Sequence, residues 1–299
     1  MPKETALDEG PFISVIIPVW NSPALIAKCL AAVGSQTYPR ERFEVLVVDN
    51  ASTDGTADIA RSFPFVTVLC EPTPGSYCAR NRGLAAARGD YVAFTDADCI
   101  PDRVWLAAAA RAARQHPEAA ILAGQIEMFR ADSTDNGICE KYESAFDFDQ
   151  ATHARNGLCV TANWVSPRRT LLDLGGFRQD LKSGGDWDLS RRIRASGRPI
   201  VYVPEMRVGH PTRGSLAKLM AKLRRTTGGK WQSNRSRWRF LSCCAALLRG
   251  SAKRVKSAAA DKRFSFADRV KIIGVVLTLL AIGMFELVRL ACGAEPKRA

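Results

Sequence analysis

Two aspartates, Asp96 and Asp98, follow a short apolar run and have a spacing that suits a divalent-metal site. The run, residues 91–95, has the length and the aromatic and β-branched content of a buried strand. If the extended geometry continues beyond it, side chains two residues apart point to the same side, so the two carboxylates converge. Facing carboxylates repel each other without a cation, and such oxygen ligands suit Mg²⁺ or Mn²⁺ with a substrate phosphate. The alternative is that Asp98 caps the next segment and Asp96 is a solvated loop acid.

The elements expected to position this pair alternate between apolar strands and helices. Strands are expected at residues 14–20, 43–49, 65–70 and 91–95, with helices at 24–33 and 77–88 and one ending at Arg61. Continuous apolar strands alternating with helices indicate a parallel sheet covered on both faces, whose ligands bind beyond the carboxyl ends of the strands. Asp49 and the Asp96/Asp98 pair both lie at such ends.

The second half of the chain is less regular. Helices are expected at 105–115, 167–174 and 187–196, and strands at 120–126, 159–165 and 200–204. His210 follows the last of these strands. Neither a G-x-G-x-x-G after the first strand nor a G-x-x-x-x-G-K-[ST] occurs, which argues against a dinucleotide dehydrogenase and a P-loop ATPase.

Composition and cysteine usage favour a globular protein of a reducing compartment. The 299 residues are 46% hydrophobic and 24% charged, which is enough to bury a core. The nine cysteines include no C-x-x-C pair, so we expect reduced thiols. Because no apolar run precedes Phe12, we expect no signal peptide.

The net charge of +13 is concentrated near the C-terminus. Residues 207–271 carry 18 Lys and Arg against two acids, Asp261 and Asp268. Such a block suits nucleic acid, anionic lipid head groups or a phosphorylated substrate, or it is an exposed helical face with no specific partner. Trp231, Trp238 and Phe240 lie among these charges, as is common at a membrane interface.

An uncharged run, residues 272–285, follows the basic block and continues as far as Cys292. The stretch is long enough to span a bilayer only if Glu286 and Arg289 pair or lie near the interface. A basic flank before it is what the positive-inside rule expects on the cytoplasmic side. The alternatives are a buried core helix and a helix that lies in the membrane plane. The pattern favours membrane association, and it favours a membrane-spanning helix slightly over an interfacial one.

Several motifs occur in order and together resemble one known family. They are SVIIPVWN, VLVVDNASTDGT, ARNRGLAAARGDYVAFTDADC, LGGFRQDLKSGGDWDLSRRI and a histidine after VYVP. Over about residues 12–232 the chain resembles the inverting family-2 glycosyltransferases of the GT-A fold. The resemblance implies an α/β domain with a Rossmann-like, doubly wound, mostly parallel sheet.

The expected organisation follows from this resemblance and from the charge pattern. An N-terminal arm (1–11) precedes the GT-A domain (12–232), which has a nucleotide-binding half (12–98) and an acceptor half (99–232). The remaining parts are a basic helical segment (233–271), a hydrophobic spanning or interfacial helix (272–292) and a tail (293–299).

The resemblance also implies a role for each matching residue on the donor side. Pro18 and Trp20 line the nucleotide site, and Asp49 hydrogen-bonds the base, or else caps a helix. Arg80 and Asn81 lie near the sugar diphosphate. The DXD motif is formed by Asp96, which also lies beside the donor, and Asp98, which is the stronger direct metal ligand.

On the acceptor side, the resemblance implies that Asp186 is the general base that deprotonates the acceptor hydroxyl. The family's preceding glutamate is Gly185 in this chain. Trp187 and Asn163 are expected to border the acceptor. His210 matches a histidine that completes the metal site or stabilises the leaving diphosphate, or it is a loop histidine without such a role.

The implied reaction is metal-dependent, inverting transfer of a hexosyl or related group from a nucleotide-diphosphate sugar to a hydroxyl. The acceptor is expected to be a glycan or a lipid-linked glycan at the cytoplasmic membrane face, in contact with anionic lipid and not with nucleic acid. The alternatives are a nucleotidyltransferase, a nucleic-acid-binding protein, suggested by the charge, and a degenerate transferase that only binds donor, suggested by Gly185.

Overall fold

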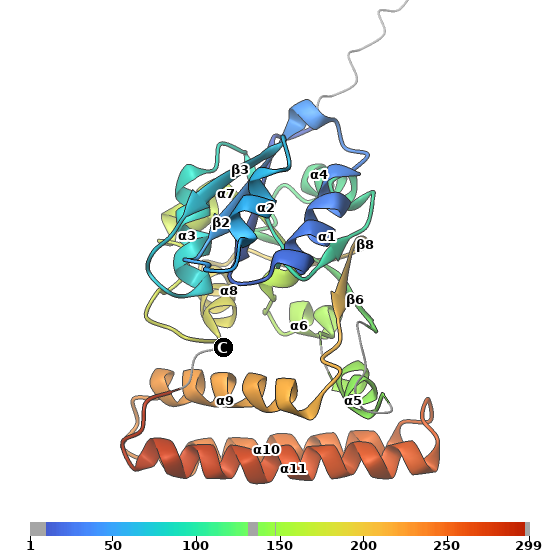
Figure 1. The fold of residues 1–299 in the computed structure, drawn as a ribbon, viewed down its shortest axis with the longest axis vertical. Coiled ribbons are helices and arrows are strands. Elements are labelled where there is room, and N and C mark those ends of the chain that lie inside the picture. The colour runs from blue at the N-terminus through green and yellow to red at the C-terminus, as the bar shows by residue number, and fades with distance from the viewer. Residues whose placement is uncertain (1–9, 131–136, 147, 297–299) are drawn as a thin grey trace, which may run out of the picture. The chain divides into compact units, whose positions relative to one another are not determined.

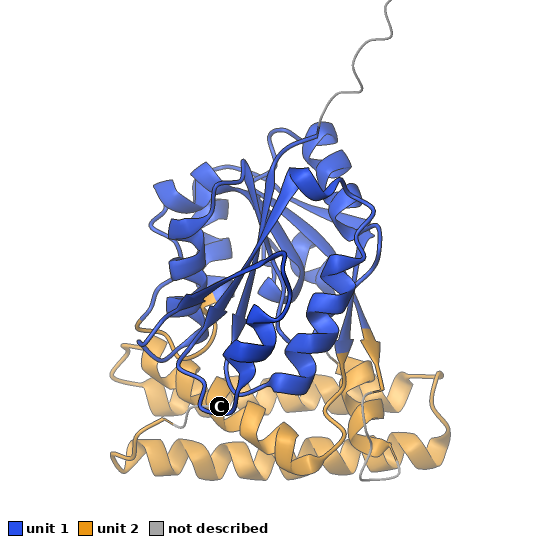
Figure 2. Cartoon of the chain, turned by 45° about the horizontal axis from the view of Figure 1, so that its top comes forward, with its two compact units in different colours: residues 1–127, 148–179, 186–210 blue, residues 128–147, 180–185, 211–299 orange. Residues whose placement is uncertain are grey.

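The computed structural model describes residues 10–130, 137–146 and 148–296. The chain divides into two compact units, coloured separately in Figure 2. Unit 1 comprises residues 1–127, 148–179 and 186–210, and unit 2 comprises residues 128–147, 180–185 and 211–299. The expected domain boundary near residue 232 therefore differs from the boundary of the units, which follows His210.

Unit 1 is built on one sheet in which eight strands from the described residues pair in the order β3-β2-β1-β4-β7-β6-β8-β5. The strands are β1 (Ile13–Val19), β2 (Phe43–Asp49), β3 (Val66–Cys70), β4 (Tyr91–Phe94), β5 (Ile100–Pro101), β6 (Ile121–Phe129), β7 (Trp164–Pro167) and β8 (Ile200–Pro211). The ends of β6 and β8 continue into unit 2.

The sheet is mixed and not mostly parallel, which corrects the sequence-based expectation. Strands β1 to β4 pair in parallel, whereas β7 runs antiparallel to both β4 and β6, and β5 runs antiparallel to β8. An apolar run predicts that a strand exists but not its direction, and β7 has only four residues.

Two other strand expectations change in extent. The run expected as a strand over 159–165 forms a 3-10 turn at Thr161–Asn163, and the strand itself, β7, begins only at Trp164. The strand expected to end at residue 204 continues as β8 to Pro211, so His210 lies in a strand and not in a loop.

Helices flank the sheet of unit 1 (Figure 1). They are α1 (Pro23–Gly34), α2 (Thr56–Arg61), α3 (Ser76–Ala86), α4 (Trp105–Gln115), α6 (Gln150–Arg155), α7 (Arg168–Asp173) and α8 (Gly185–Ala195). Helix α3 packs closely on β1 because Gly83 has no side chain. A Cβ at Gly83 would lie 2.5 Å from Cγ2 of Ile16, so α3, which carries Arg80, is held tightly against the sheet.

Unit 2 is helical in its described part, with α5 (Ile138–Phe146), α9 (Leu216–Ser233), α10 (Arg239–Ala260) and α11 (Phe266–Ala291). One side of α11 supplies Ile272, Val276 and Leu279 to an apolar core shared with the other helices. By length and composition, α11 is the one described helix able to cross a membrane. A buried charge cluster adds to this core: the fully buried Glu143 accepts hydrogen bonds from Arg213 Nη1 at 2.8 Å and Lys222 Nζ at 3.2 Å.

Candidate functional site

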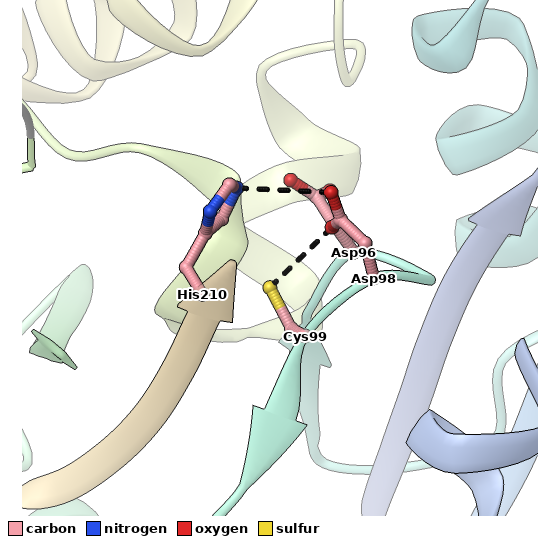
Figure 3. A group of neighbouring side chains, drawn as sticks. All are labelled: Asp96, Asp98, Cys99 and His210. Carbon is pink, nitrogen blue, oxygen red and sulfur yellow. Dashed lines mark hydrogen bonds and ion pairs between the residues drawn. The ribbon is translucent and has the colours of Figure 1, made fainter. Parts of the chain in front are cut away.

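Four side chains with metal-binding chemistry meet just beyond β4. Asp96, Asp98, Cys99 and His210 each offer a ligand atom, and these atoms lie within 4.8 Å of one another (Figure 3). Nε2 of His210 is 4.0 Å from Oδ2 of Asp98, and Sγ of Cys99 is 3.8 Å from Oδ1 of Asp98. The structure therefore brings together the aspartate pair and the histidine that the sequence analysis singled out.

Strand pairing explains how residues 112 positions apart come together. The short strand β5 follows the aspartate pair and pairs with β8, placing Ile100 opposite Gly209. The next residue of β8 is His210, which is only 3% exposed. Its ring lies against Phe148, with the two ring centroids 4.6 Å apart. This packing fixes the imidazole beside Asp98.

Arg80 of α3 holds Asp96. Its Nη2 lies 2.5 Å from Oδ1 of Asp96, and the arginine is only 4% exposed. Its Nε is buried and has no hydrogen-bond partner among the residues that the structure describes. Because Asp96 already has a cationic partner, Asp98 is the better placed of the two carboxylates to bind a metal directly.

The donor set fits a divalent cation with oxygen and nitrogen preference. Two carboxylates and an imidazole can provide three ligands and leave positions for phosphate oxygens. The thiol of Cys99 is a poor fourth ligand because burial, followed by the charges of Asp96 and Asp98, raises its pKa well above the ordinary value. Asp96, Asp98 and His210 are thus the residues that could hold the metal.

Asp186 lies in the first turn of α8 and has the electrostatics of a base. Burial raises the pKa of its carboxyl above the ordinary aspartate value; the Arg80 guanidinium and the backbone N–H of Trp187 oppose that rise, and Asp96 adds to it. The Trp187 N–H donates to Oδ1 of Asp186 at 3.0 Å. An aspartate with a raised pKa is a better proton acceptor than a solvated one.

The helix that carries Asp186 is tied to the rest of unit 1. Ser190 Oγ donates to the Asp186 carbonyl at 2.8 Å and accepts from the Cys159 N–H at 3.0 Å. Arg192 donates to the Leu174 and Gly176 carbonyls, both at 2.6 Å. These contacts fix the orientation of α8 and hence the position of the carboxylate.

The ends of β1 and β2 present the predicted nucleotide-site residues. Pro18 is partly buried, and the Trp20 side chain is 51% exposed. Asp49 is 7% exposed; its Oδ2 accepts from the Ser52 N–H at 3.2 Å. Its Oδ1 is buried and, within the described part of the chain, has no partner. An unpaired buried acceptor is what an N–H group of a nucleobase would satisfy.

Asn50, next to Asp49, is a positioning residue that the sequence analysis missed. Its Nδ2 donates to the carbonyls of Glu71 and Thr73, both at 2.8 Å, and its Oδ1 accepts from the Gly75 N–H at 2.6 Å. It therefore holds the loop that leads into α3. The sequence signal was available as an Asp-Asn pair at a strand end, which is typical of turn chemistry.

Asn163 does not line an acceptor pocket, which corrects the sequence-based expectation. It is 0% exposed. Its Nδ2 donates to the carbonyls of Gln125 (2.8 Å) and Met206 (2.7 Å). Its Oδ1 accepts from Trp105 Nε1 at 2.9 Å. All its polar atoms are thus used inside the core, where they join β6, β8 and α4.

Asn81 and Trp187 occupy different settings. Asn81 exchanges two hydrogen bonds with the backbone of Phe177, at 2.8 and 2.9 Å, so it holds that loop, and its contact with the sugar diphosphate stays a prediction. Trp187 is 36% exposed, with its ring 6.0 Å from the His153 ring. Its place beside Asp186 is compatible with the expected acceptor contact, which also stays a prediction.

Comparison with known proteins decides the family. A model of glycosyl transferase family 2 matches residues 14–160. Glycosyltransferase AglE of Haloferax volcanii is 36% identical over 218 residues, which are 70% of this chain and 70% of that protein. The chain belongs to glycosyl transferase family 2. Against the next two curated relatives, the alignment spans 45% of their length.

Solved structures of glycosyltransferases share the fold of this family member. The mannosyltransferase PcManGT from Pyrobaculum calidifontis, in complex with GDP-Man and Mn²⁺, has a TM-score of 0.59 at 24% identity, covering 94% of this chain and 87% of that one. Residues 1–349 of TarS from S. aureus, in complex with UDP-GlcNAc, have a TM-score of 0.56 at 18% identity, covering 89% and 72%. The GT-A expectation is confirmed.

Family membership settles the class of activity as glycosyl transfer and replaces the nucleotidyltransferase alternative. Asp49, Arg80, Asp96 and Asp98 lie within the matched residues 14–160, whereas Asp186 lies beyond them.

Proposed function

We propose that this family-2 glycosyltransferase transfers a sugar from a nucleotide-diphosphate sugar to an acceptor hydroxyl with inversion, in a metal-dependent reaction. The observation that carries the proposal is the meeting of two sets of groups. The cluster of Asp96, Asp98 and His210 suits a divalent cation, and Asp186 interacts electrostatically with Arg80 and Asp96 of the same site. A leaving-group site and a base are therefore neighbours.

A nucleotide is the proposed donor because of the unpaired acceptor at Asp49. Oδ1 of Asp49 can accept the N–H of a base, while the exposed Trp20 ring, which follows the neighbouring strand β1, offers a flat apolar surface. Structures that share the fold were solved with GDP-Man and with UDP-GlcNAc, which supports a nucleotide-diphosphate sugar as the donor class.

The proposed metal ligands are Asp96, Asp98 and His210, with Asp98 the most direct because Arg80 already pairs with Asp96. A bound Mg²⁺ or Mn²⁺ supplies a Lewis acid that neutralises charge developing on the departing diphosphate. The guanidinium of Arg80 adds a second positive charge near the same position. Mn²⁺ bound to PcManGT supports a divalent ion in the site.

Asp186 is the proposed general base. Its raised pKa allows it to take the proton of the acceptor hydroxyl as the oxygen attacks the anomeric carbon. The oxygen–carbon bond forms on the face opposite the leaving diphosphate as the carbon–oxygen bond to the diphosphate breaks, so one displacement inverts the centre. Because α8 is anchored through Ser190 and Arg192, the position of Asp186 does not depend on the glutamate side chain that the family has where this chain has Gly185.

The proposed acceptor is a hydroxyl of a free or lipid-linked glycan at the cytoplasmic face of the membrane. The basic block of residues 207–271 and the apolar helix α11 support this location. The same block attracts anionic lipid and a lipid-linked phosphate by charge. We propose no nucleic-acid partner.

The test compares donor binding with turnover in the full chain in mild detergent. The protein is incubated with UDP-GlcNAc or GDP-mannose, Mn²⁺ and a lipid-linked phosphate acceptor, and release of nucleoside diphosphate is measured. Asp186→Asn should keep the thermal shift caused by the nucleotide but lose about 10²- to 10⁴-fold in turnover. Asp173→Asn, an exposed aspartate of α7, is the matched control and should keep its activity.

The configuration of the product tests inversion. NMR of the anomeric proton should show the configuration opposite to that of the donor sugar. Retention, or full turnover by Asp186→Asn, would remove Asp186 and the single displacement from the account.

A further inference from the structure

We propose that α10 and α11 form a membrane-binding surface that lies in the plane of an anionic bilayer, so that α11 does not cross it. The inference deepens the membrane location in the proposed function and rests on it. It concerns unit 2 alone.

One side of α11 packs against the protein from Ile272 to Leu290. Ile272, Val276 and Leu279 lie in one buried cluster of unit 2, and Leu287 and Leu290 lie in a second. These clusters also contain residues of α9 and α10. Helix α11 is therefore an integral part of this unit and not a separate anchor.

The other side of α11 is apolar and exposed. Its exposed large apolar side chains, at 48–76% exposure, are Phe266, Val270, Leu277, Phe285 and Val288. At 3.6 residues per turn these positions fall within an arc of about 100°, which is the width of the apolar face of a typical amphipathic helix. The sequence contains no charge from Ile272 to Phe285. The exposed face of α11 is thus a continuous, uncharged apolar strip over this stretch.

Helix α10 packs beside α11 and adds apolar residues flanked by cations. Leu241 and Leu248 are 57% and 49% exposed and lie seven residues apart, on one face of α10. Arg249, Lys253 and Lys256 are exposed as well and lie to one side of that face in the helical repeat. Trp238, just before α10, is 58% exposed. Apolar strips edged by basic residues and an aromatic are typical of helices that lie in a membrane interface.

The packing of α10 on α11 argues against a span. With 26 residues, α11 is about 39 Å long, which is enough to cross a bilayer. If it crossed, α10 beside it would carry Arg249, Lys253 and Lys256 into the hydrocarbon, where each cation is strongly disfavoured. In the plane of the interface the same cations meet lipid phosphates and their attraction to anionic lipid adds to the apolar contact.

Charge also decides between a membrane and a second copy of the chain as the occupant. Residues 239–271 carry nine Lys and Arg, and two copies meeting through this surface would bring these cations together. An anionic bilayer provides the opposite charge together with an apolar layer. A bilayer therefore fits both features of the surface, and a second copy fits only the apolar one.

Vesicle flotation of the full chain tests the surface. Binding to phosphatidylcholine vesicles should increase when phosphatidylglycerol is included. The double variant Leu277→Glu, Phe285→Glu should weaken partitioning by about tenfold or more, since two charges replace exposed apolar side chains. Leu172→Glu, at a leucine of α7 that is 40% exposed, is the matched control and should float like the original protein. Equal flotation of the double variant, or a stable dimer without lipid that the double variant abolishes, would overturn the proposal.

Thiol labelling separates the in-plane arrangement from a span. Cys292 follows α11 and is exposed, and Cys70 is an exposed thiol of unit 1 that reports which side of the membrane the catalytic unit faces. In membrane vesicles with the catalytic unit outward, an impermeant maleimide followed by mass spectrometry should label both cysteines. If Cys292 reacts only after the membrane is permeabilised while Cys70 reacts at once, α11 is a span and the proposal is wrong.

The failure of this inference is distinguishable from failure of the proposed function. The thermal shift with UDP or GDP and Mn²⁺ reports the donor site and is independent of lipid. A shift that persists without flotation contradicts only the membrane surface, whereas flotation without any shift contradicts the donor site.

Discussion

Replacing Asn163 with alanine distinguishes its place in the core from the acceptor contact expected from the sequence. The side chain is fully buried and serves three partners: Trp105 Nε1 and the carbonyls of Gln125 and Met206. Alanine cannot replace any of these hydrogen bonds. Its partners would be left unpaired in a tightly packed part of the core. The packing is tight because β6 approaches closely at Gly124, where an added Cβ would lie 2.3 Å from Asn163 Nδ2.

The expected loss of stability is large for one substitution. Each of the three buried groups left without a partner costs about 1–3 kcal/mol, so we expect a total of at least about 3 kcal/mol. That is a sizeable part of the ~5–15 kcal/mol by which most proteins are stable. For a chain of this size, we expect a fall in Tm of roughly 10 °C.

Thermal and urea unfolding of the full chain measure this effect, with donor binding and turnover measured at a temperature where the variant is folded. Asn156→Ala is the matched control, because this asparagine is exposed and its side-chain Nδ2 donates to the Thr152 carbonyl, one turn back in the chain. It should lower stability by about 0.5 kcal/mol or less. Unchanged stability of Asn163→Ala together with a raised KM for the acceptor would refute the structural assignment and restore the acceptor role.

Three further substitutions test other parts of the structure. Gly229→Ala should lower kcat, because the new Cβ would lie 2.7 Å from Cβ of Ser183, in the loop that leads directly to Asp186. Gly250→Ala is its control: nothing lies within 4 Å of the added Cβ, so kcat should stay unchanged and stability should rise by about 0.5–1 kcal/mol. In a pH profile of kcat, the acid limb should lie above the ordinary aspartate pKa of about 4, because the raised pKa of Asp186 keeps the base protonated to higher pH, and this limb should vanish in Asp186→Asn. The same raised pKa favours the folded state at low pH. This contribution to stability is lost as the pH rises from the ordinary pKa through the folded-state pKa. A limb at or below the ordinary value would contradict that environment. Glu143→Gln should cost about 1–3 kcal/mol in urea unfolding, because it leaves the partly buried Arg213 and Lys222 without their counter-charge. A neutral result would show that the charge cluster does not stabilise unit 2.

Much of the parallel half of the sheet could be predicted because its strands are unbroken apolar runs. Residues 14–20 and 43–49 were expected as strands, and β1 and β2 lie at 13–19 and 43–49. Asp49, Asp96 and Asp98 were found because acids at the ends of such runs stand out. The direction of β7 was not predictable, since pairing partners far apart in the chain decide it.

Tertiary contacts decided the remaining features. Asn163 was expected at the acceptor from the family resemblance alone, whereas its partners come from β6, β8 and α4. His210 was expected after a strand that in fact continues through it, and its proximity to Asp98 depends on the pairing of β5 with β8. The hydrophobic run of α11 predicted a helix, but only its packing shows which side is already covered.

The most direct test of the central claim is metal-dependent nucleotide binding at the aspartate cluster. The full chain is suitable in mild detergent, because α11 supplies part of the core of unit 2. Its Tm is measured with UDP, GDP, dTDP or CMP, each with and without Mn²⁺. A ligand at 100 times its Kd adds about 2.7 kcal/mol to the native state. We predict a rise in Tm with one nucleoside diphosphate that requires Mn²⁺ and is lost in Asp98→Ala, with Asp173→Ala as the control. No shift with any nucleotide, or a shift that survives in Asp98→Ala, would contradict the account.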